Sequence, residues 1–125
     1  MTALRICLID DEEGFVTTLA ERLELRGHTP IVALSGEEGL QCIAEHSPHV
    51  VVLDLRMPGI GGMETLRRIR AAWPKLPVVM LSGHGAETDI AACLRSGAQA
   101  YLKKPTDISQ LLATIHEVLE PSGGQ

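Results

Sequence analysis

The side chains in this sequence that are best suited to chemistry are acids, a hydroxyl and a lysine. Each comes directly or almost directly after a short apolar run. Asp10 and Asp11 follow the first run, Asp54 the third, Ser82 the fourth and Lys104 the fifth. A carboxylate nucleophile, an acidic pair, a hydroxyl and a lysine together suit phosphoryl transfer, in which positioning and charge neutralisation provide most of the catalysis.

Carboxylates gathered at one place would repel one another strongly. Two carboxylates about 4 Å apart repel by roughly 4 kcal/mol at an effective dielectric constant of about 20. A hard divalent cation with oxygen ligands relieves this repulsion, and Mg²⁺ typically takes one or two carboxylates together with waters and phosphate oxygens. The sequence therefore predicts a Mg²⁺ site, at which Mn²⁺ is a substitute, with Lys104 as a further positive charge for phosphate oxygens.

Each of these residues has a simpler explanation when it is taken alone. The acidic run Asp10–Glu13 is typical of a solvated helix start favoured by the helix dipole. Asp54 suits the cap of a turn, Ser82 suits ordinary turn chemistry, and Lys104 alone would be surface charge. Their joint occurrence, in order and each at the end of an apolar run, favours a shared site instead.

The apolar runs are rich in β-branched residues and predict five strands. The first, third and fourth runs are almost continuously apolar, as expected for parallel strands covered on both faces. The predicted strands are Leu4–Ile9, Thr29–Ala33, Val50–Leu53, Val78–Leu81 and Ala100–Leu102.

Residues with helical spacing fill the intervals between these strands. The stripes that define the helices are Phe15, Leu19 and Leu23; Leu40 and Ile43; Met63, Leu66 and Ile69; a stretch from about Ala86 to Ser96; and Ile108, Leu111, Leu112, Ile115 and Leu119. Gly27 stops the first helix, Ser35 with Glu38 forms a capping box for the second, and Asp107 or Thr106 caps the fifth. Five β–α units predict an α/β fold, a doubly wound parallel sheet with five helices that binds ligands at the carboxyl ends of its strands.

Length and composition predict a single domain over residues 1–120, with residues 121–125 as a tail or the start of a linker. Hydrophobic residues make up 45% and charged residues 22% of the chain, an ordinary globular balance. No apolar run reaches membrane-spanning length and the start does not resemble a signal peptide, so we expect a cytoplasmic protein without a membrane partner.

Charge, aromatic content and cysteine usage argue against three further classes. The net charge of −5 and the scarcity of aromatic residues argue against direct nucleic acid binding by this domain. Cys7, Cys42 and Cys93 are odd in number and scattered, which favours small reduced core residues over a disulfide framework or a zinc site.

The sequence resembles the receiver domains of response regulators in two-component signal transduction over essentially its whole length. The resemblance rests on four motifs in order, which are Ile9-Asp10-Asp11-Glu12, Asp54-Leu55-Arg56-Met57-Pro58-Gly59, Ser82-Gly83 and Lys104-Pro105. It implies a flavodoxin-like sheet with the strand order 2-1-3-4-5, an order that is typical of this family.

The same resemblance implies a role for the acidic residues. Asp54 matches the phosphoacceptor, which takes a phosphoryl group from a phosphohistidine on a sensor histidine kinase or a phosphotransfer protein. Asp10, Asp11, Asp54 and the backbone carbonyl of Arg56 match the metal ligands, with Asp11 binding Mg²⁺ directly and Asp10 largely through water. Such a domain is a signalling phosphoacceptor rather than an enzyme, and catalyses only its own phosphorylation and slow autodephosphorylation.

The resemblance also implies a switch. Ser82, at a position where threonine is the commoner choice, and Lys104 match the residues that contact the phosphoryl group, and Tyr101 matches the aromatic switch. The bond before Pro105 is implied to be cis. The output would act through the face formed by the fourth helix, fifth strand and fifth helix, on an output domain or target protein, or through a phosphorylation-dependent homodimer.

The resemblance further implies that Arg56 and His84 occupy positions at which family members vary and at which the lifetime of the phosphoryl group is tuned.

Three other interpretations fit the sequence less well. A haloacid-dehalogenase-like phosphatase needs a second aspartate two residues after Asp54, where Arg56 stands. A flavodoxin-like electron carrier needs a hydroxyl- and glycine-rich loop after the first strand, where Asp10–Glu13 would repel flavin phosphate. A degenerate receiver, used only for protein interaction, would not need the acidic pair, the acceptor and the lysine together.

Overall fold

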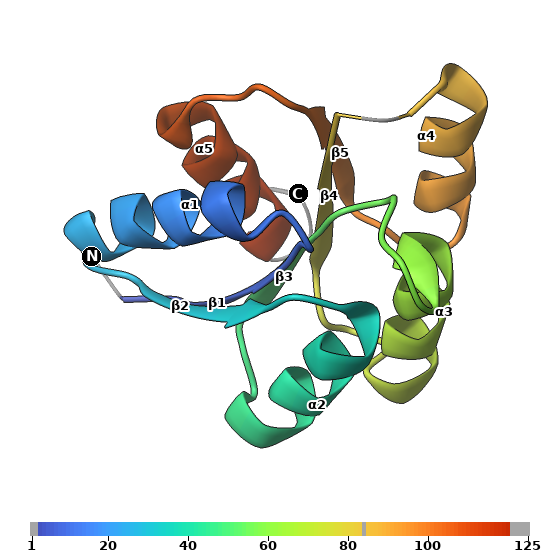
Figure 1. The fold of residues 1–125 in the computed structure, drawn as a ribbon, viewed down its shortest axis with the longest axis horizontal. Helices are drawn as coiled ribbons and strands as arrows, with labels where there is room; N and C mark the ends of the chain where they lie inside the picture. Colours follow the sequence, from blue (N-terminus) through green and yellow to red (C-terminus); the bar gives the residue numbers. More distant parts are fainter. Residues whose placement is uncertain (1–2, 84, 121–125) are drawn as a thin grey trace.

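The computed structural model describes residues 3–83 and 85–120, which form a five-stranded parallel sheet with helices on both faces (Figure 1). The elements are β1 (Arg5–Ile9), α1 (Glu13–Leu25), β2 (Thr29–Ala33), α2 (Gly36–His46), β3 (Val50–Leu53), α3 (Gly61–Ala72), β4 (Val78–Ser82), α4 (Glu87–Arg95), β5 (Ala100–Lys103) and α5 (Ile108–Leu119). The strands lie in the order β2-β1-β3-β4-β5. The predicted α/β class and the flavodoxin-like order 2-1-3-4-5 are confirmed.

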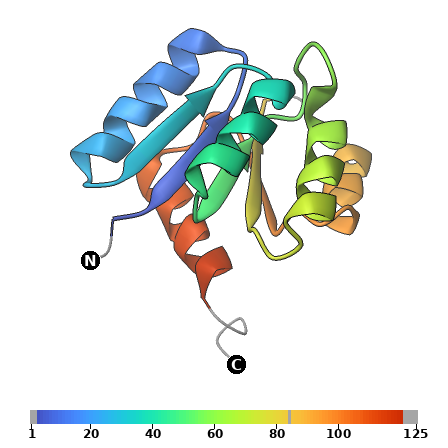
Figure 2. The ribbon, with the colours of Figure 1, turned by 90° about the horizontal axis from the view of Figure 1, so that it is seen from below.

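The helices form two layers, with α1 and α5 on one face of the sheet and α2, α3 and α4 on the other (Figures 1 and 2). Successive strand residues point to opposite faces, so that in β1 Ile6 and Leu8 pack beneath α1 and α5, while Cys7 and Ile9 pack beneath the other layer. Both faces of the central strands are therefore buried, which explains why their sequences are continuously apolar.

Local signals place the ends of the helices close to where the sequence predicts them. Gly27 has a φ of +88° two residues beyond α1, a left-handed conformation that favours glycine. The Ser35 hydroxyl accepts a hydrogen bond from the Glu38 amide at the start of α2. Of the two caps expected for α5, Asp107 is the one found, because its carboxylate accepts from the Gln110 amide at 2.7 Å.

The three cysteines are free, as expected of reduced core residues. Cys7 and Cys93 are buried and Cys42 is half-buried. Burial raises the pKa of the Cys7 thiol to about 12, so this thiol stays protonated and behaves as an apolar core group.

No helix in the described part of the chain is both long enough and apolar enough to cross a membrane.

Candidate functional site

Four strands deliver predicted site residues to one edge of the sheet. Asp10 directly follows β1, Asp54 directly follows β3, Ser82 ends β4, and Lys104 directly follows β5. Backbone hydrogen bonds continue the sheet at these points, since the Asp54 amide donates to the Ile9 carbonyl at 2.9 Å and the Lys104 amide to the Ser82 carbonyl at 3.0 Å. The parallel topology therefore fixes the backbone of each residue before any side-chain contact is made.

Lys104 is the centre of a charged network at this edge. Its Nζ lies 2.6 Å from Glu12 Oε1, 2.9 Å from Asp10 Oδ2 and 3.9 Å from Asp54 Oδ2. Burial acts to lower the pKa of Lys104, but hydrogen bonds to Glu12 and Asp10 outweigh burial and raise the pKa overall. Lys104 is therefore held as a charged ammonium with little exposure to water.

Three carboxylates converge around this ammonium. One oxygen atom from each of Asp10, Glu12 and Asp54 lies within 4.8 Å of the other two. Asp10 and Asp54 are buried, at 5% and 2% exposure, and burial raises the pKa of Asp10 although the hydrogen bond from Lys104 partly offsets this effect. Three acids facing one ammonium form a hard oxygen donor set with excess negative charge, a composition that fits Mg²⁺ or Mn²⁺.

Asp54 is held in place by its own backbone. Asp54 Oδ1 accepts a hydrogen bond from the Leu55 amide at 2.8 Å. Gly62, in the first turn of α3, packs so closely that a Cβ atom there would overlap the Asp54 and Leu55 carbonyl oxygens. Because this contact is between backbones and neither side can rotate away, only glycine fits under Asp54 at this point.

The turn after β1 contains the clearest difference from the expected ligand set. Asp11, expected to bind the metal directly, has an exposed side chain and is not one of the three converging carboxylates. Glu12 converges instead, although it was not among the predicted ligands. The sequence signal for Glu12 was the acidic run itself, which does not indicate which of its members points inward.

The remaining predicted residues lie around this edge. Arg56 is exposed and its guanidinium lies 3.9 Å from the Asp89 carboxylate of α4. The peptide bond between Lys104 and Pro105 is cis. His84 lies outside the described residues.

Ser82 and Tyr101 form a second, neutral part of the site. Ser82 is buried and Tyr101 is half-buried, and the Tyr101 hydroxyl lies so close to the Gly85 backbone that a Cβ there would overlap it. Burial raises the pKa of the Tyr101 hydroxyl, and a hydrogen bond with Ser82 partly offsets this. The end of β4 is thus connected through one hydrogen bond to the aromatic residue of β5.

Taken together, the fold and this edge define a doubly wound α/β domain with a buried carboxylate, neighbouring acids and a lysine arranged for phosphoryl chemistry. Residues 6–116 match the response regulator receiver domain family, and the chain belongs to this family of signalling phosphoacceptors in two-component systems.

Relatives and solved structures agree with this assignment. The transcriptional regulatory protein AfsQ1 of Streptomyces coelicolor is 39% identical over 114 residues, which cover 91% of this chain and 50% of AfsQ1. The transcriptional regulatory protein GlrR of Escherichia coli is 34% identical over 117 residues, covering 94% of this chain and 26% of GlrR. The chain thus spans half or less of the length of these regulators.

Among solved structures, the receiver domain of NtrX from Brucella abortus superimposes with a TM-score of 0.87 at 32% identity, covering 94% of this chain and 99% of that one. A CheY-like receiver domain protein from Methanospirillum hungatei has a TM-score of 0.89 at 27% identity, covering 94% of each chain.

Proposed function

We propose that Asp54 is the phosphoacceptor of this receiver domain, and that the donor is a phosphohistidine on a sensor histidine kinase or a phosphotransfer protein. The observation that carries the proposal is the position of Asp54, a buried carboxylate whose Oδ2 faces the Lys104 ammonium at 3.9 Å. Its other oxygen is held by the Leu55 amide, so Oδ2 is the oxygen oriented for attack.

In the proposed reaction, Asp54 Oδ2 attacks phosphorus, the bond between phosphorus and the donor histidine nitrogen breaks, and the histidine takes the electron pair. Lys104 neutralises negative charge on the phosphoryl oxygens, and Ser82 donates its hydroxyl hydrogen to one of them. These residues contribute position and charge, which are the main sources of catalysis in phosphoryl transfer.

Mg²⁺, or Mn²⁺ as a substitute, would be held at this edge by Asp10, Asp54 and the Arg56 carbonyl, with Asp11 as the further ligand that the family implies. Glu12 is a competing candidate for that further ligand because its carboxylate lies with Asp10 and Asp54. When bound, the ion neutralises the crowded carboxylates and polarises the phosphoryl group.

The proposal includes slow autodephosphorylation, which the family implies. Water attacks phosphorus opposite Asp54, the bond between phosphorus and Asp54 Oδ2 breaks, and inorganic phosphate leaves, which restores the carboxylate. The domain would thus act as a timer rather than as an enzyme with turnover on other substrates. Arg56 and His84 set the lifetime of the phosphoryl group.

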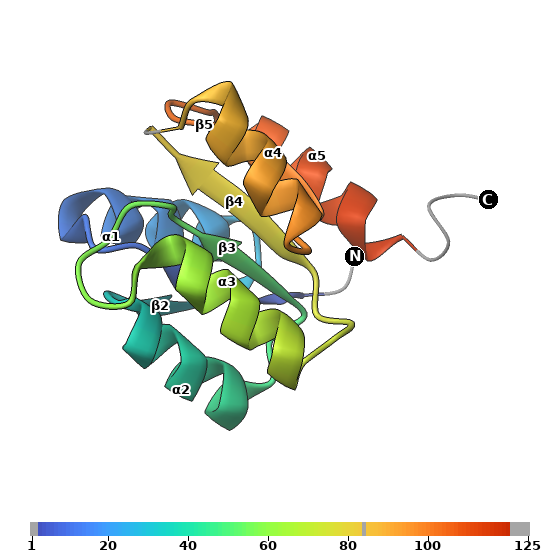
Figure 3. The same ribbon diagram turned by 90° about the vertical axis from the view of Figure 1, so that its right-hand side faces the viewer.

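The output in this proposal leaves through the face formed by α4, β5 and α5, which lie together at one end of the sheet (Figure 3). Tyr101 of β5 connects this face to Ser82. The target is an output domain, a separate protein or a second copy of the chain, and relatives named as transcriptional regulators support the first of these. In this scheme residues 1–120 are the receiver domain, residues 121–125 are a tail or the start of a linker, and the domain works in the cytoplasm.

The test is phosphorylation by acetyl phosphate in the presence of Mg²⁺. The wild type should gain one phosphoryl group that is stable in acid and labile in alkali, and Asp54→Asn should gain none. Asp107→Asn is a matched control, because it makes the same change at an exposed helix cap where asparagine also caps well. Undiminished labelling of Asp54→Asn would contradict the assignment.

A further inference from the structure

Among the described residues, the aromatic ring of Phe15 is a neighbour of Lys104 that takes no part in the chemistry above. Lys104 Nζ lies over this ring, 4.2 Å from its centroid. A cation over the face of an aromatic ring is attracted by the negative potential of the π-system. Phe15 stands in the first turn of α1, and Glu12 immediately precedes that helix, so one short segment supplies two of the groups that contact the ammonium.

The ring has an advantage over another carboxylate at this position. The edge already carries three acids against one ammonium, and it has to receive a phosphoryl group that brings more negative charge. A further acid would hold Lys104 but would also repel the phosphoryl group. An aromatic face attracts the cation without adding a charge.

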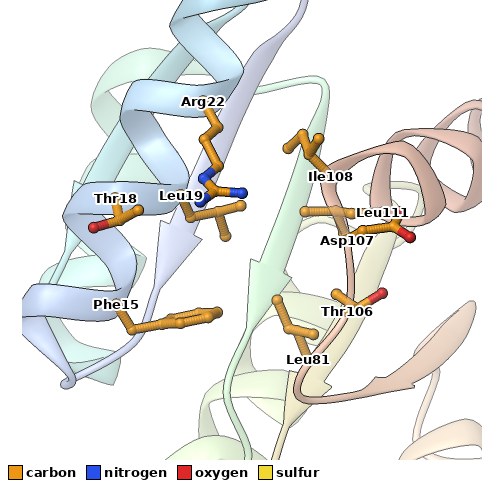
Figure 4. Close-up of a pocket in the computed structure, with 9 residues that line it drawn as sticks. All are labelled: Phe15, Thr18, Leu19, Arg22, Leu81, Thr106, Asp107, Ile108 and Leu111. Carbon is orange, nitrogen blue, oxygen red and sulfur yellow. The ribbon is translucent and has the colours of Figure 1, made fainter.

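The surroundings show what the ring prevents. A cavity of about 210 Å³ lies between α1 and α5, and Phe15 lines it together with Leu19 and Leu81. Figure 4 shows the Phe15 ring extending from α1 toward Leu81. Removal of the ring would open this space beside the lysine, so that the side chain of Lys104, which is 13% exposed, would gain room to turn away from Asp54.

We propose that Phe15 is a positioning residue for phosphoryl transfer, whose ring face holds the Lys104 ammonium beside Asp54 before the phosphoryl group arrives. The inference rests on the function proposed above. It differs from a purely structural role, in which Phe15 would only fill space between α1 and the sheet and any apolar side chain of similar size would serve.

Fluorination of the ring separates these two roles. Phe15 is the only phenylalanine in the chain, so growth on mono-, di- or trifluorophenylalanine changes this one side chain. Each added fluorine withdraws electron density from the ring face while the ring keeps its shape, which weakens the attraction for a cation. We expect the rate of Asp54 phosphorylation by acetyl phosphate to fall stepwise along the series, reaching about threefold to tenfold for the trifluoro ring.

Controls establish that the effect belongs to this ring. Trp73 is the only tryptophan and caps the end of α3, so fluorotryptophan introduces fluorine elsewhere and should leave the rate unchanged. Phe15→Leu, which keeps an apolar side chain without a ring, should slow phosphorylation of Asp54. Phe15→Tyr, which keeps an aromatic ring, should retain most of the wild-type rate. Equal rates across the fluorinated series, or a Phe15→Leu variant as fast as the wild type, would overturn the proposal.

A second measurement does not depend on activity or on the variants. In the metal-free protein, the ε-methylene protons of Lys104 should resonate upfield of those of the exposed Lys75 and Lys103, because they lie over the ring. Coincident signals would overturn the contact. Labelling that survives Asp54→Asn overturns the proposed function itself, whereas a flat fluorination series in a protein labelled at Asp54 overturns only the role of Phe15.

Discussion

Replacement of Asp54 by asparagine should stabilise the metal-free protein, although we expect the same replacement to abolish phosphorylation. One oxygen each from Asp10, Glu12 and Asp54 lies within 4.8 Å of the others, and at that separation each repulsion on Asp54 is about 3.5 kcal/mol at an effective dielectric constant of about 20. The opposing attraction of Lys104 at 3.9 Å is about 4.3 kcal/mol on the same scale. The two repulsions together exceed the attraction, which leaves a net electrostatic cost of ionising Asp54 of between about 2 and 3 kcal/mol.

Solvent reduces this value, because Glu12 has a side chain that is 57% exposed and its repulsion is partly screened. Asparagine keeps the oxygen that accepts from the Leu55 amide, and its amino group can donate to the neighbouring acids. We therefore expect the free energy of unfolding to rise by about 1–2 kcal/mol for Asp54→Asn in the absence of divalent ions.

The assay is denaturant unfolding of the wild type and Asp54→Asn, first with a chelator and then with millimolar Mg²⁺. An ion that binds the folded state stabilises it by mass action, so Mg²⁺ should stabilise the wild type more and narrow the difference. Asp107→Asn should change stability little in both conditions. An Asp54→Asn variant that is no more stable than the wild type in chelator would refute a net repulsion on the Asp54 carboxylate.

Three further outcomes follow from contacts at and beyond the site. Gly62→Ala should lower the free energy of unfolding by about 1–3 kcal/mol and impair phosphorylation, because the new Cβ overlaps backbone beneath Asp54. Gly14→Ala, in open space within α1, should instead raise the free energy of unfolding by about 0.5–1 kcal/mol. Unfolding curves that coincide for the two variants would contradict this prediction. Ser82→Ala should leave Asp54 able to be phosphorylated but reduce the change that phosphorylation causes at Tyr101. Tyr101 is the only tyrosine, so ¹⁹F NMR of fluorotyrosine reports this change, and a full wild-type change would exclude coupling from Ser82 to Tyr101. Burial, and to a lesser extent the neighbouring His116, lowers the pKa of His28 from its usual 6.5. As the pH falls, the unfolded chain therefore takes up this proton before the folded protein does, so the contribution of His28 to stability should be complete above pH 6.5 and decline below it. His28→Gln should flatten this decline in the free energy of unfolding measured from pH 7.5 to 5, and an unchanged slope would exclude His28 as its source.

Most of the fold could be predicted because the signals in the sequence are local and agree with one another. The β3 strand is a continuous run of buried apolar residues, and α5 has a stripe of apolar residues preceded by a cap at Asp107. Once parallel strands are inferred, their carboxyl ends must lie at one edge, so the meeting of Asp10, Asp54 and Lys104 required no knowledge of side-chain conformation.

The parts that could not be predicted depend on the conformations of individual residues. In the turn after β1, Asp11 and Glu12 are adjacent acids, and the backbone of Glu12, with φ −82° and ψ 91°, decides which of them reaches the lysine. The contact between Phe15 and Lys104 is similar, because the helical spacing of Phe15 predicts only that it faces the sheet. Which part of the site its ring covers depends on side chains almost ninety residues apart in the sequence.

The hydrogen bond between Ser82 and Tyr101 changes how the switch should be understood. The family resemblance assigns Ser82 to the phosphoryl group and Tyr101 to the aromatic switch, without a direct contact between them. In the structure the two hydroxyls are already connected, so a phosphoryl group on Asp54 would compete with Tyr101 for the Ser82 hydroxyl. A hydrogen bond to a charged phosphoryl oxygen is stronger than one between neutral hydroxyls, which favours the new partner. The difference between these two bonds limits how far phosphorylation can shift Tyr101 between its two states, because a ligand biases an equilibrium only by its differential affinity for each state.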